Sequence, residues 1–420
     1  MKIISRIKIA VCTVLAVMLA FGCIPEPGSE RVEAKGASQA IGWGIDVSAW
    51  QGDIDWYAVK ASGVQFVFIK CGGTIYGLDE KFVQNMAGAQ AAGIKTGVYI
   101  YSYASSVADA MVEAQWVINA CAPFIINMPV VLDIENYRQE RLDPLTNAMI
   151  CQTFCQIVEA AGYYPMVYSN RSMLRDKIGP FTYDKWVAQW NDYCYDESAA
   201  FWQSTDSYLV PGINGYVDLD YQFKDLSSYI VPYGFVTRDG YTFYYENYRR
   251  QSNRFFIVGD GIYYVDVFGH LVANTLYPVG DYIYYFDKNG MMQVGFVNFA
   301  DGIRYFDENG HMLTGWQNLA GFTYLFDISG VMQTGFVTDG VNIYYMNDAG
   351  VMQTGLFSVG KSLYFADLNG HLQTGLVTMS GLSFYFDPAK GGALLVNGTA
   401  TDAQGHIYVA DATGLAFMIK

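Results

Sequence analysis

The sequence predicts an α/β domain, for which a barrel is favoured over an open sheet, followed by an all-β solenoid built from hairpin repeats. In the first half of the chain, short apolar runs rich in β-branched and aromatic residues alternate with segments of helical periodicity. Near-continuous apolar strands separated by helices are typical of a parallel sheet that is buried on both faces. In the second half, the chain repeats with a period of 20 residues, which indicates a stack of repeated structural units.

The first domain is predicted to span about residues 41–226. Its predicted strands are Val64–Lys70, Thr96–Ser102, Met128–Asp133 and Tyr164–Ser169. Glu80–Ala92 and Val107–Ala120 lie between them and carry apolar residues at a spacing near 3.6, which predicts helices. Gly93 follows the first of these helices, as a C-terminal stop signal should. In barrels and in open α/β sheets alike, the chemistry sits at the C-terminal ends of the strands.

The second domain is predicted to span residues 227–420. Its glycines recur in register at Gly290, Gly310, Gly330, Gly350 and Gly370, and again at Gly295, Gly315, Gly335, Gly355 and Gly375. Each copy is predicted as an aromatic strand, an Asp/Asn-x-x-Gly turn and a short second strand. A single hairpin cannot bury its aromatic face, so neighbouring hairpins are expected to stack. Residues 233–274 and 381–420 resemble degenerate copies at the junction and at the end of the array.

The first 40 residues predict export. Three basic residues within the first eight precede Ile9–Gly22, an uncharged and mostly apolar run of 14 residues that is short for a membrane span. Cys23 follows at once, so the segment also resembles a lipobox, and simple cleavage and lipid attachment at Cys23 both remain open. Residues 24–40 lack periodicity and are predicted to form a tether. The protein is therefore expected outside the cell, at the cell wall or the cell surface.

Charge and histidine content exclude several classes of function. The net charge is −15 and no cluster of Lys and Arg occurs outside the extreme N-terminus, so nucleic acid is not an expected partner. The four histidines are His270, His311, His371 and His406, and all lie in the repeats. The first domain therefore cannot use Ser-His-Asp or Cys-His catalysis or a zinc site built on histidine. No metal or cofactor is expected, and what remains is carboxylate chemistry, on which glycoside hydrolysis runs.

Acidic residues occur where the strands of the first domain should end. Met128–Glu135 is an apolar strand that finishes in Asp133 and Glu135, whose i and i+2 spacing puts both side chains on one face. Because unpaired charges at a buried strand end are costly, we favour a catalytic pair over a structural ion-pair site. Asp46 and Asp218 close the first and last candidate strands, which are neighbours in a closed barrel. Each of these two alone is as readily a capping or turn residue.

Several segments of the first domain match a known family and occur in the family's order. They are Gly44–Gly52 with Ile54–Trp56, Phe66–Lys70, Gly93–Tyr101, Val130–Glu135, Trp186–Trp190, Trp202–Gln203 and Gly212–Asp220. On these segments, which cover about residues 41–226, the domain resembles the family 25 glycoside hydrolases, the lysozymes typified by fungal and phage muramidases.

The resemblance implies an irregular TIM-like (β/α) barrel of eight strands with fewer helices than a regular one. It also implies cleavage of the β-1,4 bond between N-acetylmuramic acid and N-acetylglucosamine in peptidoglycan. By motif, Glu135 is the general acid, and Asp133 stabilises positive charge or orients the substrate's N-acetyl group. Asp46 and Asp218 would line the same site. Asp220 departs from the family, in which Asn is common at this position. Retaining, inverting and substrate-assisted courses all remain open.

Sugar rings bind well on aromatic faces, and several aromatic residues lie at or near predicted strand ends. Tyr101, Tyr168 and Trp190, together with Gln203, are the candidate substrate-binding residues, and Trp202 is a further aromatic candidate. For any single one of the aromatic residues, packing in the core is at least as good an explanation. The alternative for the whole protein is a surface adhesin whose barrel binds glycan without hydrolysing it.

The repeats resemble the wall-binding repeats of choline-binding proteins and the glucan- and toxin-type oligopeptide repeats. In the choline-binding form, paired Trp and Tyr make an aromatic cage around a quaternary ammonium group. Here the usual first Trp of the aromatic strand is replaced by Ile283, Ile303, Thr323, Ile343 and Leu363, and the array's one Trp is Trp316. We therefore expect weak, multivalent binding of a glycan or wall polymer rather than of choline, with a purely structural spacer as the alternative.

Overall fold

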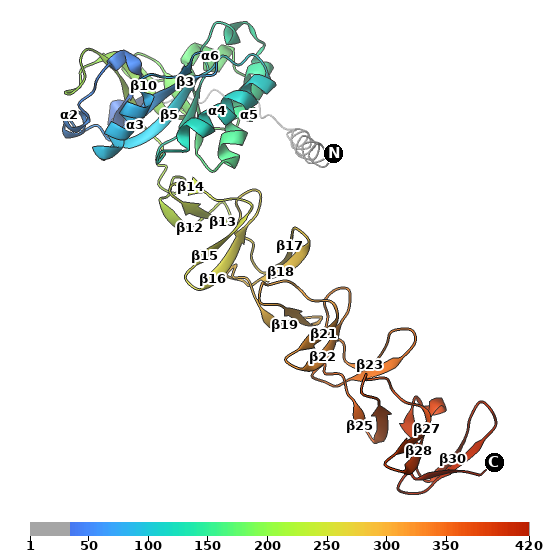
Figure 1. Cartoon of the computed structure of the whole chain (residues 1–420). Coiled ribbons are helices and arrows are strands. Elements are labelled where there is room, and N and C mark those ends of the chain that lie inside the picture. Colours follow the sequence, from blue (N-terminus) through green and yellow to red (C-terminus); the bar gives the residue numbers. More distant parts are fainter. Residues whose placement is uncertain (1–33, 420) are drawn as a thin grey trace. The chain divides into compact units, whose positions relative to one another are not determined.

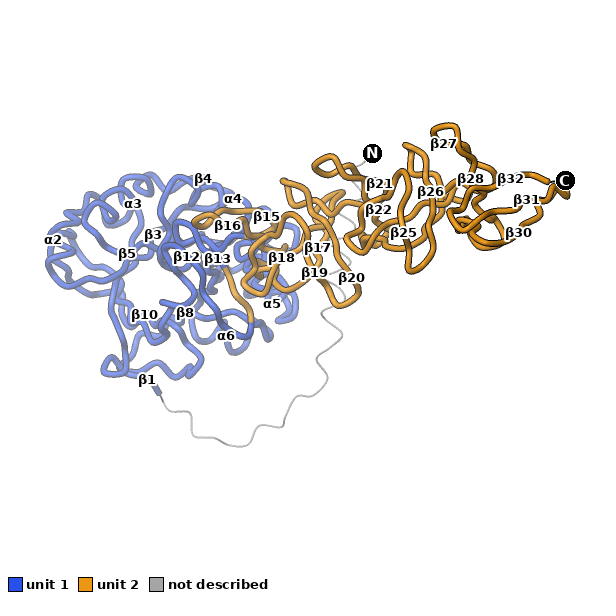
Figure 2. Tube along the Cα trace, turned by 90° about the horizontal axis from the view of Figure 1, so that it is seen from below, with its two compact units in different colours: residues 1–240, 244–251 blue, residues 241–243, 252–420 orange. Residues whose placement is uncertain are grey.

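The computed structural model describes residues 34–419, so the predicted export segment, Cys23 and most of the predicted tether lie outside the described residues. The chain divides into two compact units (Figure 2). The first ends at Gly240 and also includes Tyr244–Gln251, whereas the second comprises Tyr241–Phe243 and the residues from Ser252 onward. Within the described part, no helix combines the length and apolar character needed to cross a membrane.

Eight strands of the described first unit close into a barrel (Figure 1). They are, in their order around the ring, β2 (Gly42–Val47), β3 (Phe66–Gly73), β5 (Lys95–Tyr101), β6 (Val130–Asp133), β7 (Pro165–Asn170), β8 (Lys185–Ala188), β10 (Ala199–Tyr208) and β11 (Val217–Gln222). β2 pairs with both β3 and β11, which closes the ring. The closed sheet confirms the prediction of a barrel over an open sheet.

The last strand of the barrel runs against the predicted direction. β11 pairs antiparallel with both β10 and β2, whereas the other neighbours around the ring pair in parallel. Asp218 was expected to close this strand, but it is the second residue of β11. Because β11 is reversed, its first residues lie at the same rim as the last residues of the parallel strands, and Asp218 pairs with Asp46.

Helices connect the parallel strands. They are α2 (Trp56–Ala61), α3 (Phe82–Ala91), α4 (Val107–Cys121), α5 (Pro144–Ala160) and α6 (Arg171–Asp176), and α3 and α4 confirm the two helices predicted from periodicity. The side chain of Ser106 caps α4 by accepting a hydrogen bond from the N–H of Asp109, and Asp143 caps α5, which starts with a proline. The buried faces of these helices share one apolar cluster with outward-facing strand residues such as Val67.

Alternate strand residues fill the inside of the barrel. The inward-facing residues form a second buried cluster, in which Phe68 stacks on Trp186 with ring centroids 4.5 Å apart. At the rim, the inward positions change from apolar to polar, since Val131 of β6 is followed two residues later by Asp133. The packed apolar interior of the barrel thus lies directly next to a layer of polar side chains at the rim.

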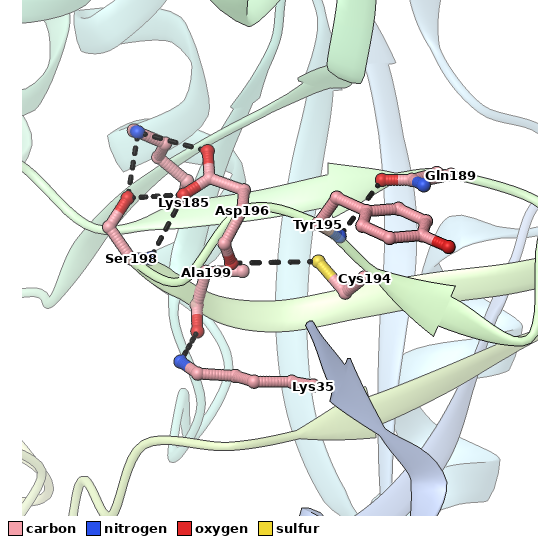
Figure 3. A network of polar contacts seen from close by, with 8 residues as sticks. All are labelled: Lys35, Lys185, Gln189, Cys194, Tyr195, Asp196, Ser198 and Ala199. Atoms are coloured by element: carbon pink, nitrogen blue, oxygen red, sulfur yellow. Dashed lines mark hydrogen bonds and ion pairs between the residues drawn. The ribbon is translucent and has the colours of Figure 1, made fainter. Parts of the chain in front are cut away.

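Residues at the end of the predicted tether belong to the first unit. β1 (Lys35–Gly36) pairs antiparallel with β9 (Tyr193–Cys194), and Lys35 Nζ donates a hydrogen bond of 3.1 Å to the carbonyl oxygen of Ala199 (Figure 3). A strand of two residues carries no periodicity, so this pairing could not be predicted from the sequence. The other short elements between β1 and β11 are β4 (Gly77–Leu78) and the 3-10 helices Ala37–Gln39, Ala49–Gln51 and Gln139–Arg141.

The second half of the described chain consists of short antiparallel strands, as predicted. They are β12 (Tyr233–Arg238), β13 (Tyr241–Glu246), β14 (Arg249–Arg250), β15 (Arg254–Val258), β16 (Gly261–Val265), β17 (Thr275–Val279), β18 (Tyr282–Phe286), β19 (Gly295–Phe299), β20 (Gly302–Phe306), β21 (Gly315–Leu319), β22 (Phe322–Phe326), β23 (Gly335–Thr338), β24 (Ile343–Met346), β25 (Gly355–Val359), β26 (Ser362–Ala366), β27 (Gly375–Met379), β28 (Leu382–Asp387), β29 (Ala393–Leu394), β30 (Gly398–Thr401), β31 (Ile407–Ala410) and β32 (Ala416–Met418). A 3-10 helix, Pro388–Lys390, follows β28. From β15 to β26 the strands pair two by two as hairpins.

The hairpin turn lies at a different place in each copy from the predicted one. β19 and β20 form one hairpin, and the Asp307 turn comes after it, not within it. The chain after that turn makes only a single bridge, at Met312, instead of the predicted second strand. The reason is that the Asp307 side chain accepts hydrogen bonds of 2.8 and 2.9 Å from two backbone N–H groups, which holds a wider loop. The N–H of Met312 then donates to the carbonyl oxygen of Ile283, so consecutive copies are hydrogen-bonded.

Candidate active site

The structure brings the four predicted carboxylates together at one rim of the barrel. Asp46 lies one residue before the end of β2, and Asp133 is the last residue of β6. Asp218 pairs with Asp46 across β2 and β11, and Glu135 follows β6 by two residues. Each carboxyl either has its pKa raised by the charge of another member of the set or raises the pKa of another member by its own charge.

Asp133 and Glu135 lie at the end of β6 and form one side of this group. Asp133 is 4% exposed, and its Oδ1 atom has no hydrogen-bond partner among the residues that the structure describes. Burial raises the pKa of Asp133 well above its usual range, and the charge of Glu135 adds to the rise. Burial likewise raises the pKa of Glu135, while the positive charge of Lys70 lowers the pKa of both. The site therefore favours a retained proton at this pair.

Asp46 and Asp218 form the opposite side of the group. Burial raises the pKa of Asp46 well above its usual range, and the neighbouring charge of Asp218 raises it further. Burial and the charge of Asp206 raise the pKa of Asp218 to about 6. Neighbouring like charges resist simultaneous ionisation, and a cationic centre at the rim would favour the ionised form of these acids.

Gln203 orients the carboxyl group of Asp46 through a hydrogen bond. Its side chain is 4% exposed and its Nε2 donates a hydrogen bond of 2.8 Å to Asp46 Oδ2. Its Oε1 accepts hydrogen bonds from the hydroxyl of Tyr168 (3.0 Å) and from Nε1 of Trp190 (3.2 Å). Three of the predicted substrate-binding residues are therefore joined in one network that ends on a rim carboxylate. The orienting role of Gln203 was not foreseen, because its contacts join strands far apart in the sequence.

The predicted aromatic residues differ in exposure. Trp190 is 62% exposed and offers its ring to solvent, whereas Tyr168 is buried within the barrel cluster. Trp202 is also buried, donates from Nε1 to the carbonyl oxygen of Gln189, and stacks on Tyr221 in a separate apolar cluster. For Trp202, core packing is therefore the correct explanation.

A pocket of about 350 Å³ lies beside Tyr101 at the same rim. It is lined by Lys70, Ile75, Tyr76, Tyr101, Tyr103, Asn136, Tyr137 and Arg138. The rings of Tyr76, Tyr103 and Tyr101 follow one another, with centroids 5.6 and 5.2 Å apart, and make an aromatic wall. Burial raises the pKa of Tyr101 to about 12, which keeps its phenol protonated and able to donate. Tyr76 and Tyr103 were missed because they lie in loops without strand periodicity.

Another pocket, of about 420 Å³, is lined by residues of α6 and of the segment between β8 and β10, including Arg171, Lys185 and Asp196. None of the rim carboxylates lines it. None of them lines the pocket beside Tyr101 either, but that pocket borders the rim, because Tyr101 pairs with Asp133 across β5 and β6 and Asn136 directly follows Glu135.

Comparison with known proteins gives consistent matches in the barrel. Residues 45–213 match the model of glycosyl hydrolases family 25. The autolytic lysozyme of Clostridium acetobutylicum is 29% identical over 181 residues, which are 42% of this chain and 54% of that protein. The protein YegX of Escherichia coli O157:H7 is 30% identical over 187 residues, which are 42% of this chain and 68% of that protein. The chain thus spans about half the length of the autolytic lysozyme.

Solved structures of modular wall proteins are also similar to parts of the chain. The modular autolysin LytC of Streptococcus pneumoniae, in complex with a synthetic peptidoglycan ligand, has 28% identity and a TM-score of 0.39, over 43% of this chain and 46% of that one. Choline binding protein F of the same organism, in the presence of a peptidoglycan analogue, has 26% identity and a TM-score of 0.37, over 43% of this chain and 61% of that one.

Proposed function

The chain belongs to glycosyl hydrolase family 25, and on that premise we propose that its barrel hydrolyses the β-1,4 bond between N-acetylmuramic acid and N-acetylglucosamine in peptidoglycan. The observation that carries the proposal is the set of Asp46, Asp133, Glu135 and Asp218 at one rim of a closed barrel. Glycoside hydrolysis needs one protonated and one ionised carboxyl flanking the bond, and a crowded, buried group of acids supplies both states. On this proposal the barrel is an irregular TIM-like (β/α) barrel.

Glu135 is the proton donor in this proposal. Burial raises its pKa, so the carboxyl keeps its proton at a pH at which an exposed glutamate has lost it. It is also less buried than Asp133, as a group that must reach the glycosidic oxygen should be. Protonation of that oxygen lets the leaving sugar depart as an alcohol rather than as an alkoxide.

In this proposal, Asp133 supplies the negative charge that complements the proton donor Glu135. Its buried Oδ1 lacks a hydrogen-bond donor within the described residues, and the acetamido N–H of the substrate would meet that need. Burial raises the pKa of Asp133 as well, whereas the positive charge of Lys70 favours its ionised form. The ionised carboxylate would orient the acetamido group and oppose the positive charge that develops at the anomeric carbon. Asp46 and Asp218 contribute negative charge from the other side of the rim. The exposed ring of Trp190 and the tyrosine wall at Tyr101 are suited to stack on the neighbouring sugars.

A zymogram tests the proposal directly. The purified wild-type protein should clear a gel that contains peptidoglycan. Absence of clearing by folded protein would contradict the enzymatic proposal and favour the adhesin, in which the same rim binds glycan without turnover.

Lys70→Met is expected to shift the pH–activity profile to higher pH. Lys70 lowers the pKa of Asp133 and Glu135, so its removal raises both. The acid limb, which requires an ionised carboxylate, and the alkaline limb, which requires the protonated acid, then move in the same direction. The pH dependence of kcat/KM on soluble muropeptides measures the shift. Lys95→Met, an exposed lysine at the start of β5, is the control, and an equal profile for both variants would contradict the expectation.

We propose further that the hairpins stack as a solenoid and hold the enzyme on the wall. One column of apolar side chains recurs every 20 residues and stays between 40% and 55% exposed, namely Phe296, Trp316, Phe336, Leu356 and Leu376. A repeated exposed apolar surface is typical of a binding face, and many weak contacts to a glycan or wall polymer add up through effective concentration. Such an enzyme acts outside the cell, at the wall or surface, whether secreted or lipid-anchored through Cys23.

Removing residues 252–420 is expected to abolish binding to the wall while leaving catalysis intact. The rim carboxylates and the whole of the first unit up to Gln251 remain, so turnover of soluble muropeptides should be preserved. Activity on intact walls should fall about tenfold or more, because the effective concentration at the surface is lost. Reducing ends released from soluble fragments and from whole walls give the two rates. An equal loss of activity on both substrates would contradict the proposal that the first unit catalyses the reaction and the repeats bind the wall.

The repeats alone should pull down with insoluble walls, and millimolar choline should release them poorly. The cage positions are half-exposed aliphatic residues, Ile283, Ile343 and Leu363 among them, which lack the ring face that a quaternary ammonium needs. Clean release by choline would contradict the proposed ligand. Failure to bind walls or glucans at all would leave the array as a spacer.

A further inference from the structure

Asp220 is a buried acid next to the catalytic rim that the proposed mechanism does not use. It lies two residues after Asp218 on β11, opposite Gly44 of β2 and Gln203 of β10. Its exposed fraction is 0%. Its Oδ1 accepts a hydrogen bond of 2.8 Å from Nε1 of Trp186, and its Oδ2 is buried without any donor from the described residues. An ionised carboxylate in this position would leave one charged oxygen unsatisfied, which is costly.

The neighbour of Asp220 is another acceptor. Because Asp218 is opposite Asp46 and Asp220 is opposite Gly44, Asp220 and Asp46 are diagonal neighbours on the inner face of two paired strands, within reach of each other. Both side chains are buried on that inner face, and Asp220 Oδ2 is the polar atom there that has no partner among the described residues. Two ionised carboxylates have no donor between them, so a hydrogen bond between Asp46 and Asp220 can form only when one of the two carries a proton.

The distribution of partners identifies the protonated member. Asp46 already receives the 2.8 Å hydrogen bond from Gln203 and is 6% exposed at the rim, whereas Asp220 is sealed and keeps one oxygen without a donor. We propose that Asp220 is a positioning residue that carries a proton at neutral pH and donates it in a hydrogen bond to Asp46, which fixes that carboxylate in its ionised form. The role of Asp46 as a charged group of the site rests on the proposed function.

The electrostatic surroundings agree with this assignment. The acids that face Asp220 are Asp46 of β2 and Asp218 of its own strand, and both raise its pKa beyond the larger rise caused by burial. Trp186 of β8 and Gln203 of β10 are the neutral partners on the remaining sides. Burial, Asp218 and Glu135 raise the pKa of Asp46, whereas the hydrogen bonds from Gln203 and Asp220 lower it. The proton on Asp220 thus offsets part of the cost of ionising Asp46.

The pH dependence of stability tests the proposal without any turnover. The folded-state pKa of Asp220 is raised, so the folded protein keeps a proton that the unfolded chain releases above about pH 4. Stability from this site is therefore complete below about pH 4 and is lost as the pH rises toward the folded pKa. Asp220→Asn keeps an acceptor for Trp186 and a donor for Asp46 but has no proton to lose. Its Tm should match that of the wild type at about pH 3 and exceed it by about 3–5 °C or more at about pH 7.

The measurement is thermal unfolding of the full chain followed by tryptophan fluorescence, since seven of its eight tryptophans precede residue 227. Asp348→Asn, an exposed aspartate in a turn of the array, makes the same charge change and should show no such divergence with pH. A pH-independent difference between Asp220→Asn and the wild type, or a lower Tm for Asp220→Asn at about pH 7, would overturn the proposal.

Two further readouts separate positioning from simple packing. Infrared spectroscopy of the wild type at about pH 7 should show a carboxylic acid C=O band that Asp220→Asn removes and Asp348→Asn retains. In activity, Asp220→Asn should restore what Asp220→Leu loses, because leucine gives Asp46 no donor and should lower kcat about tenfold or more with little change in KM. Absence of the band would overturn the proposal even if Asp220→Leu failed to fold. A protein without hydrolase activity would contradict the proposed function while leaving the infrared and stability results to judge Asp220.

Discussion

Glu135→Gln is expected to lower kcat on peptidoglycan by about 10²–10⁴-fold while the protein stays folded. The amide has the shape of the acid but cannot deliver a proton to the glycosidic oxygen. The pKa of Glu135 is raised mainly by burial, so replacing it with a neutral group removes a desolvation cost and should not destabilise the barrel. The rate of release of reducing ends, measured beside thermal unfolding, gives both quantities.

A substrate with an activated leaving group sharpens this test. An aryl glycoside of the muramic-acid sugar departs without strong protonation, so Glu135→Gln should recover most of its lost rate on it. Glu140→Gln, an exposed glutamate five residues further along the chain, is the matched control and should behave as the wild type on both substrates. Near-normal activity of Glu135→Gln on peptidoglycan would mean that another carboxyl is the acid.

Asp133→Asn is expected to lower kcat by about 10²-fold or more, and on both kinds of substrate. The substitution removes negative charge next to the anomeric centre and replaces one carboxylate oxygen by an amide nitrogen that cannot accept the acetamido N–H. Because Asp133 is 4% exposed and its Oδ1 has no donor within the described residues, the neutral amide should not cost stability. The activated substrate should not rescue this variant, since the missing interaction acts on the sugar and not on the leaving group.

The comparison of the two variants assigns the roles. Asp192→Asn, an exposed aspartate after β8, controls for loss of one negative charge near the rim and should retain wild-type rates. Rescue of Asp133→Asn by the aryl leaving group, with no rescue of Glu135→Gln, would contradict the assignment and exchange the two roles.

The sequence predicted the parts of the fold that local patterns encode. The apolar runs around Val67 and Val131 were predicted because burial on both faces makes a parallel strand nearly continuously apolar, and the helices α3 and α4 because burial of one face gives a period of 3.6. The meeting of Asp46 and Asp218 followed from the requirement that the first and last strands of a closed barrel are neighbours. The direction of β11 was missed, since alternation of side chains reads the same in a parallel and in an antiparallel strand.

The features of the site that could not be predicted from the sequence depend on contacts between strands that are far apart in the chain. The hydrogen bond from Gln203 to Asp46 joins residues 157 positions apart, and that from Tyr168 to Gln203 joins residues 35 apart. No local motif encodes either one. In the repeats, each copy contains two turn signals that both fit the local rules, so the sequence pattern does not show that the turn at Asp307 lies outside the hairpin. The contact between Met312 and the preceding copy decided between them.

The proposed cleavage site is tested by mass spectrometry of the products that the wild-type protein releases from purified peptidoglycan. We expect muropeptides whose new reducing ends lie on N-acetylmuramic acid, and we expect these products to be absent from the digest made with Glu135→Gln. Products whose new reducing ends lie on N-acetylglucosamine, or the same products from the Glu135→Gln digest, would contradict this expectation.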